Sequence, residues 1–250
     1  MFQDIMFKQP IIRVNNREDN IEFFNKTLGL RLKSEENSIA ELTDFGNRES
    51  YLTIEESPSY RTRACKGLKK LNKISIFTKD NSSVVRLLQT SQQVTKIYKG
   101  INGYAFECLS PEQDTFLLHS EEDVTNLVLS DYPVFEDFEG DFRGLLDFSY
   151  KEITLNVLDE KESFSFYQAL LPESLVSMFR FSQSEGDDLN APCHETWDIE
   201  ILEFVVGSDT ELRSIKEQLV NQGKNVYLDK KERLLVITDP SGIELWFQKK

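Results

Sequence analysis

The hydrophobic positions follow one recurring order along the chain: a strand pattern, a polar cap, an amphipathic helix and then further strands. The first instance opens with the strand pattern of residues 9–14 and passes Asn16 into a helix. Ile21, Phe24 and Leu28 are spaced three and four residues apart in this helix, as on one buried helical face. Gly29 supplies the left-handed position that ends many helices, and strand patterns follow over residues 31–56.

The same order recurs three more times, beginning near residues 73, 152 and 197. Each helix again has a candidate N-cap: Asp80, Asp159, and either Ser208 or Asp209. The uneven spacing indicates modules with variable loops and not a solenoid. The pattern therefore predicts an α+β fold of four βαβββ modules. Because sequential modules have the shortest connections, we expect modules one and two to pair into one domain and modules three and four into another.

The predicted domains are residues 1–120 and 148–250, with an acidic connection at residues 121–147. This connection holds nine Asp or Glu residues and one basic residue, Arg143. It also carries apolar side chains, so we expect it to pack on a domain. Those side chains are Leu127, Val128, Leu129, Phe135 and Phe138.

Composition and charge narrow the function classes. A net charge of −14 argues against a nucleic-acid partner, because phosphate binding needs a basic surface. The longest apolar runs are about five residues, so we expect no membrane span. Residues 1–8 lack a basic segment followed by an apolar run, so they do not resemble a secretory signal. Cys65, Cys108 and Cys193 are far apart and form no CxxC pair, which is typical of reduced thiols and favours the cytoplasm.

Two features resemble the vicinal-oxygen-chelate superfamily, which includes glyoxalases and extradiol dioxygenases. One is the sequence RVNN at residues 13–16, ahead of a helix containing Phe23 and Phe24. The other is a turn of DP-G type before a strand, at residues 239–242 and in degenerate form at residues 110–112. The resemblance implies that the paired modules form cupped sheets, each with a cleft.

A closer resemblance covers nearly the whole chain. Four segments are similar to the streptococcal CppA family: residues 61–71, 98–107, 196–198 and 244–247. That family carries the label of a proteinase that degrades the third complement component. The resemblance implies this activity, and with it a complement component as a possible protein partner.

The superfamily resemblance also implies where metal ligands would lie, namely on the first and last strands of paired modules. The polar residues at these positions are Gln9, Thr53 or Glu55, Glu152 and Glu244. Other matching positions hold Lys73, Ile201 and Leu117, which do not suit a divalent metal. No histidine falls on the expected strands in a paired set, so the His-His-Glu iron site of extradiol dioxygenases is absent. We expect no cofactor; a site of Gln and Glu alone would bind a hard divalent cation weakly.

Protease chemistry has few candidate residues in this chain. There is no GxSxG motif, and the two histidines are the only bases of their type. His194 begins a sequence that superficially resembles HExxH, but the fifth residue is Asp198. Cys193 precedes His194, and neighbouring strand residues point to opposite faces. His119 shares a strand face with Leu117, so it either lines the first domain's cleft or ends a solvated strand.

One basic segment stands out at residues 60–73, which contain six Lys or Arg residues and no acid. In so acidic a chain it is either a local site for a carboxylate or phosphate, or a solvated loop between modules. With His119, the candidate ligand-binding residues are Arg61, Arg63, Lys69 and Lys70.

These observations favour a binding module for a small molecule or a protein partner, acting through the sheet clefts or the basic segment. Two enzyme readings stay open: the proteinase that the family label names, and a weak metal-dependent activity of glyoxalase or dioxygenase type.

Overall fold

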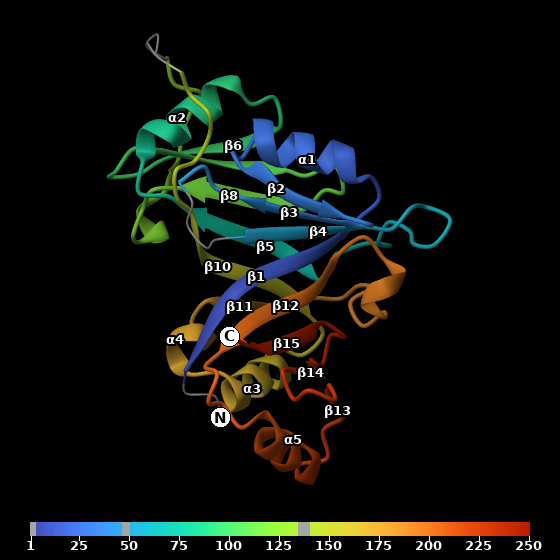
Figure 1. Cartoon of the computed structure of the whole chain (residues 1–250). Coiled ribbons are helices and arrows are strands. Elements are labelled where there is room, and N and C mark those ends of the chain that lie inside the picture. The colour runs from blue at the N-terminus through green and yellow to red at the C-terminus, as the bar shows by residue number, and fades with distance from the viewer. Residues whose placement is uncertain (1–3, 47–50, 135–140) are drawn as a thin grey trace.

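The computed structural model describes residues 4–46, 51–134 and 141–250, whose strands form two sheets (Figure 1). The eight-stranded sheet has the order β13-β14-β15-β12-β1-β4-β3-β2. The seven-stranded sheet has the order β11-β10-β5-β8-β7-β6-β9. The predicted α+β class is therefore confirmed.

Modules one and four build the eight-stranded sheet. Module one comprises β1 (Ile5–Val14), α1 (Arg17–Lys26), β2 (Arg31–Glu36), β3 (Ile39–Thr43) and β4 (Tyr51–Glu56). Module four comprises β12 (Ile199–Val206), α5 (Leu212–Asn221), β13 (Val226–Leu228), β14 (Leu234–Thr238) and β15 (Glu244–Lys249).

Modules two and three build the seven-stranded sheet. Module two comprises β5 (Leu71–Phe77), α2 (Asn81–Thr90), β6 (Val94–Lys99), β7 (Tyr104–Leu109) and β8 (Thr115–His119). Module three is shorter than predicted and comprises β10 (Ser149–Val157), α3 (Glu160–Leu170), α4 (Glu173–Val176) and β11 (Phe179–Gln183). The stretch from β11 to β12 holds only the 3-10 helix η2 (Cys193–Glu195).

The predicted pairing of module one with module two, and of module three with module four, is wrong. β1 runs antiparallel to β12 with Ile11 opposite Ile201, and β5 runs antiparallel to β10 with Ile74 opposite Ile153. Module one therefore pairs with module four, and module two with module three. Figure 1 shows the blue β1 beside the orange β12. Each sheet thus draws strands from both residues 1–120 and residues 148–250.

Modules one and two are neighbours in space, but they pack face to face and not edge to edge. The ring of Phe24 in α1 lies 5.3 Å from that of Phe116 in β8, on the other sheet. This contact keeps the connection between modules one and two short without joining their strands. The rule that connections are short correctly predicted that modules one and two lie close together, but the contact is between their faces and not between the edges of their strands.

An aromatic cluster joins the inner faces of the two sheets. The Phe7 ring of β1 lies 5.4 Å from Tyr150, 5.9 Å from Phe179 and 5.4 Å from Phe204. Tyr150 and Phe179 belong to the seven-stranded sheet, and one continuous cluster of buried apolar residues surrounds this contact. Because strand side chains alternate, the residues between these inner ones form a second, outer face on each sheet.

Helix ends agree with the sequence in three modules. The side chains of Asn16, Asp80 and Asp159 each accept a hydrogen bond from a backbone N–H in the first helical turn. The prediction of Ser208 or Asp209 is wrong, because α5 starts later, after Glu211, whose side chain makes no capping bond.

The acidic connection contributes the 3-10 helix η1 (Val124–Asn126) and the short edge strand β9 (Val128–Leu129). The packing predicted for its apolar residues is wrong at Val128 and Leu129, whose exposed fractions are 66% and 68%. Phe135 and Phe138 lie outside the described residues. Within the described ranges, none of the helices combines the length and apolar character needed to cross a membrane.

Candidate ligand-binding site

The outer face of the eight-stranded sheet gathers three of the positions considered for a metal. Gln9 lies on β1, Glu55 on the adjacent β4, and Glu244 on β15 beside β12. The strand register places Arg13 opposite Glu55 and Ile201 opposite Glu244. Glu152 lies on the other sheet, so the structure does not bring all four together.

Gln9 is committed to a buried hydrogen-bond network. Its amide N–H donates to Glu203 Oε2 at 2.7 Å, and its amide oxygen accepts from Thr53 Oγ1 at 2.8 Å. Lys8 Nζ contacts the other carboxylate oxygen of Glu203 at 3.2 Å. Both ends of the Gln9 amide are thus engaged by neighbouring side chains.

Arg13 lies among carboxylates on the same face. Its Nη2 donates to Glu200 Oε1 at 2.5 Å, and its Nη1 lies 3.6 Å from Glu55 Oε1. Glu200 is the extra residue of a β-bulge, since Ile11 lies opposite Ile201 and Ile12 opposite Ile199. A bulge re-aims a side chain, and here it turns Glu200 toward Arg13.

Burial raises the pKa of Glu200, and the charges of Glu55 and Glu244 add to the rise, against the opposing effect of Arg13. The carboxylates of this cluster therefore repel each other, and the positive charge of the Arg13 guanidinium offsets that repulsion.

Two buried polar atoms of this cluster have no hydrogen-bond partner: Arg13 Nε, a donor, and Glu200 Oε2, an acceptor. Ile11 and Ile201 lie beside them and are apolar. Trp246 closes the face on β15, where its indole Nε1 donates to Glu244 Oε2 at 2.7 Å. This outer face thus combines one unmet donor, one unmet acceptor and an apolar surface.

A metal does not fit this arrangement. The guanidinium of Arg13 sits between Glu55 and Glu200, where a cation would need their oxygens, and Gln9 is already engaged. Across the described ranges, no group of three or more His, Cys, Asp or Glu side chains is arranged to hold a metal ion.

The outer face of the seven-stranded sheet carries His119 with Ser75, a residue that the sequence did not single out. His119 is buried, and its Nε2 lies 2.7 Å from Ser75 Oγ on the adjacent β5. The backbone N–H of Glu121 donates to His119 Nδ1 at 3.2 Å. Burial lowers the pKa of His119 to about 4, so the ring is neutral at pH 7.

This geometry fixes the direction of the Ser75–His119 bond. Because Nδ1 accepts, the single proton of the neutral ring is on Nε2, which donates to Ser75. A nucleophilic serine needs the reverse arrangement, in which a histidine nitrogen takes up its proton. The pair is therefore a structural hydrogen bond and not a catalytic dyad.

The other polar positions of this face are also paired. Lys73 and Lys96 both contact Glu107, at 3.4 Å and 2.9 Å. Glu152, considered for a metal, pairs with Arg180 at 3.0 Å.

The basic segment connects the two halves of the chain. Arg63 makes two hydrogen bonds to Asp188, at 2.6 and 2.8 Å. Lys69 Nζ lies 2.5 Å from Asp114, and the buried Lys70 donates to the carbonyl of Ala191. Carboxylates thus pair with Arg63 and Lys69, and Lys70 is buried against a carbonyl, so these three cations are engaged within the protein and do not favour an anion site. Arg61 is exposed and lies over the Tyr60 ring.

The cysteine thiols are not activated. Burial raises the pKa of Cys193 to about 12 and that of Cys65 to about 11, and it also raises the pKa of Cys108. Cys193 and His194 do point apart, with Cys193 buried and His194 exposed, but they belong to the 3-10 helix η2 and not to a strand.

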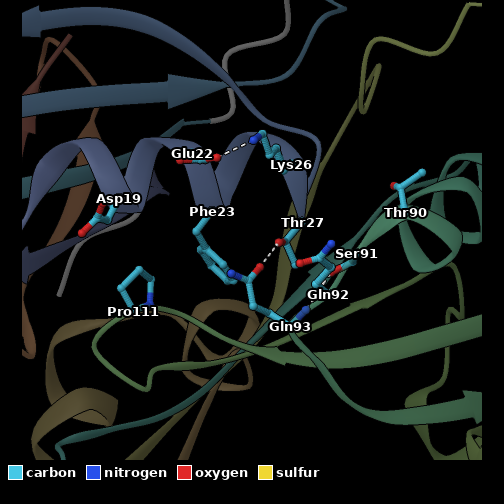
Figure 2. A pocket seen from close by; sticks show the side chains of 10 residues that line it. All are labelled: Asp19, Glu22, Phe23, Lys26, Thr27, Thr90, Ser91, Gln92, Gln93 and Pro111. Carbon is cyan, nitrogen blue, oxygen red and sulfur yellow. Dashed lines mark hydrogen bonds and ion pairs between the residues drawn. The ribbon is translucent and has the colours of Figure 1, made fainter.

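A cavity of about 500 Å³ lies between α1 and the segment after α2 (Figure 2). Four of its polar side chains bond to each other: Lys26 pairs with Glu22, and Thr27 Oγ1 donates to Gln93 Oε1 at 2.7 Å. It contains none of the outer-face residues, and its paired lining gives it no evident chemistry.

The fold is that of the glyoxalases and dioxygenases of the vicinal-oxygen-chelate superfamily. A putative dioxygenase from Bacillus subtilis superposes with a TM-score of 0.58 at 9% identity, over 100% of this chain and 86% of that one. Glyoxalase I from Zea mays superposes with a TM-score of 0.54 at 13% identity, over 98% and 92% of the two chains. At such identities the similarity concerns the fold alone.

Two family models then give the particular family. The CppA N-terminal model matches residues 7–130, and the CppA C-terminal model matches residues 145–247. The chain therefore belongs to the CppA family. The crystal structure of the cppA protein from Streptococcus pneumoniae TIGR4 is 31% identical, covers 99% of each chain and has a TM-score of 0.84. Comparison with curated proteins gave no match.

Sequence reasoning missed Ser75 and Glu200 for different reasons. Ser75 and His119 lie on the first and last strands of module two, two residues beyond the considered positions Lys73 and Leu117. Extending the first-and-last-strand rule along each strand would have found that pair. Glu200 had no such signal, because a bulge that re-aims a side chain is not visible in a single sequence.

Proposed function

We propose that this chain is a metal-independent binding protein, and that its ligand site is the outer face of the eight-stranded sheet. The observation that carries the proposal is the pair of unmet buried atoms, Arg13 Nε and Glu200 Oε2. Buried polar groups in folded proteins nearly always have partners, so an unmatched donor beside an unmatched acceptor points to a bound molecule or water that supplies both.

The ligand is a small polar molecule that presents an acceptor to Arg13 and a donor to Glu200. Its apolar part rests on Ile11, Ile201 and the half-buried ring of Trp246, a combination typical of small-molecule sites. Carboxylates outnumber basic groups on this face, because Glu55 and Glu200 both contact Arg13, and the charge of Glu244 acts on Glu200. The proposed ligand is therefore neutral or cationic, such as an amide or an amine.

The test is a ligand screen with two matched arginine variants. Arg13→Lys keeps the charge but removes Nε, while Arg180→Lys makes the same change at an ion pair on the other sheet. Amides and amines would be screened by thermal shift, followed by calorimetry on the hits. We expect a ligand whose Kd rises about tenfold in Arg13→Lys, the loss of roughly one hydrogen bond to a charged group, and is unchanged in Arg180→Lys.

Two results would contradict the proposal. One is a ligand that binds Arg13→Lys as tightly as the unaltered protein. The other is a fragment mixture that leaves the NMR signals of Ile11, Ile201 and Trp246 unmoved, since these side chains form the proposed contact surface.

The compartment proposed is the cytoplasm. Its support is that Cys65, Cys108 and Cys193 are all free thiols.

A further inference from the structure

A cavity of about 430 Å³ lies where the two halves of the chain meet, away from both outer sheet faces. Four segments enclose it: the end of β1, the basic segment, the turn between β7 and β8, and the strand entry at Trp197. Its principal polar and aromatic lining consists of Asn15, Asn16, Asp19, Glu112, Gln113 and Trp197.

The Trp197 ring is fixed as one wall of this cavity. Its indole Nε1 donates to the carbonyl of Ser57 and to Thr62 Oγ1, both at 2.8 Å. These bonds hold the edge of the ring, and the side chain remains partly exposed beside the cavity. An aromatic ring held by its polar edge offers its apolar face to a ligand at little entropic cost.

The polar wall is also preorganised. The carboxylate of Glu112 accepts from the backbone N–H of Asn15 at 3.0 Å and from Asn20 Nδ2 at 2.8 Å. Gln113 has a φ of 67°, a left-handed conformation that is uncommon for a residue other than glycine. Asn20, buried behind this wall, keeps a side-chain oxygen without a partner.

The charge of the cavity excludes simple anions. Lys69 is its lysine, and that ammonium group contacts Asp114 at 2.5 Å and the Glu112 carbonyl at 3.0 Å. The remaining charged lining residues, Asp19 and Glu112, are carboxylates. Planar amides and carboxylates of this kind bind adjacent hydroxyl groups, which donate and accept at once.

We infer that this cavity binds a neutral polyhydroxylated ligand of the monosaccharide class. The C–H face of the sugar packs on Trp197, and its hydroxyls bond to Asn15, Glu112 and Gln113. This site is separate from the outer-face site and does not depend on it, because the two share none of their lining residues.

NMR of the two indole N–H groups tests the inference directly. The chain has two tryptophans, so its spectrum has two indole signals, and Trp246→Phe identifies which one belongs to Trp197. Glucose, galactose and N-acetylglucosamine would each be titrated into the unaltered protein. For at least one sugar we expect a saturable shift of the Trp197 signal, with a Kd on the order of 1 mM, a typical weak small-ligand affinity.

Two glycine variants control for folding. Gln113→Gly removes a cavity side chain and relieves the strain of a left-handed backbone. Asn37→Gly relieves the same kind of backbone strain, at a φ of 54°, in a turn outside the cavity. We expect Gln113→Gly to weaken sugar binding about fivefold, the loss of one net hydrogen bond, and Asn37→Gly to leave it unchanged. Melting curves of both variants establish that they are folded.

Either of two outcomes overturns the inference. The first is the absence of any saturable Trp197 shift with all three sugars up to about 50 mM, well above the expected Kd. The second is a shift whose Kd is the same in Gln113→Gly and Asn37→Gly, which would place the sugar elsewhere.

Discussion

Ser75 and His119 are joined by a buried hydrogen bond of 2.7 Å in which the histidine is the donor. The direction follows from the backbone N–H of Glu121, which already occupies His119 Nδ1. The bond links β5 to β8, the first and last strands of one module. Protonation of the ring would leave Nε2 donating to Ser75, but Nδ1 could no longer accept from the backbone N–H of Glu121, which would become a buried donor without a partner.

His119 should therefore make stability fall with acidification. The unfolded chain takes up a proton on this histidine near pH 6.5, but the folded protein does so only near pH 4. The contribution is complete above about pH 6.5 and is lost progressively toward pH 4, and it amounts to roughly 3 kcal/mol. Denaturant unfolding of the unaltered protein and of His119→Gln across this range measures it. The difference between the two free energies of unfolding should shrink as pH falls; a constant difference would contradict the lowered pKa.

The proteinase label makes a separate prediction. We expect highly purified protein to degrade the third complement component weakly or not at all, because no thiol or hydroxyl among the described residues is paired with a base able to take up its proton. Any residual cleavage should persist in each of five variants, which would identify a co-purifying protease. These are Ser75→Ala, Cys108→Ala, His119→Ala, Cys193→Ala and His194→Ala. Robust cleavage that one substitution abolishes would establish a catalytic site on this fold.

Metal content gives a third prediction. We expect less than about one equivalent of any transition metal in the purified protein, unchanged in Glu152→Ala and Glu244→Ala, since neither belongs to a complete ligand set. Arg13→Met should behave differently, because it removes the guanidinium and leaves Glu55, Glu200 and Glu244 facing each other. That variant should gain Ca²⁺ or Mn²⁺ binding with a Kd on the order of 1 mM. Calorimetry checks the gain, with Arg180→Met as the matched control.

Asp198 gives a prediction about stability. Its carboxylate accepts from the backbone N–H groups of Lys70 at 2.6 Å, Leu71 at 3.0 Å and Ile199 at 2.8 Å. Asp198→Ala leaves these buried donors without an acceptor, so we expect a loss of about 3 kcal/mol or more in the free energy of unfolding. Asp187→Ala, at an exposed position, should change it by less than about 0.5 kcal/mol. Equal losses in the two variants would show that the three hydrogen bonds accepted by Asp198 do not contribute to stability.

The sequence predicted the local structure of this protein better than its long-range pairing. Asn16, Asp80 and Asp159 cap helices as expected, because capping depends on residues within one turn. The pairing of β1 with β12 depends on which module faces which, and short connections allow both edge-to-edge and face-to-face packing.

The candidate site shows the same difference between local features, which were predictable, and long-range contacts, which were not. The superfamily resemblance placed Gln9 on a first strand and Glu244 on a last strand, but in different predicted domains, whereas the structure brings both to the eight-stranded sheet. The roles of Lys69 and Arg63 were not predictable, because their partners Asp114 and Asp188 are distant in sequence. The sequence therefore left an anion site and a solvated loop as alternatives for the basic segment, whereas Arg63 pairs with Asp188 in the second half of the chain and Lys69 with Asp114 in the first.

The pairing of β1 with β12 also sets the order of events during synthesis. β1 leaves the ribosome long before its antiparallel partner β12, which begins only at Ile199. While the residues between β1 and β12 are synthesised, a strand destined for the centre of a sheet therefore has one unpaired edge, which is a template for wrong pairing with other chains. The nascent chain of this protein should consequently depend on chaperones until module four emerges, and a ribosome stalled between β1 and β12 would display an aggregation-prone strand.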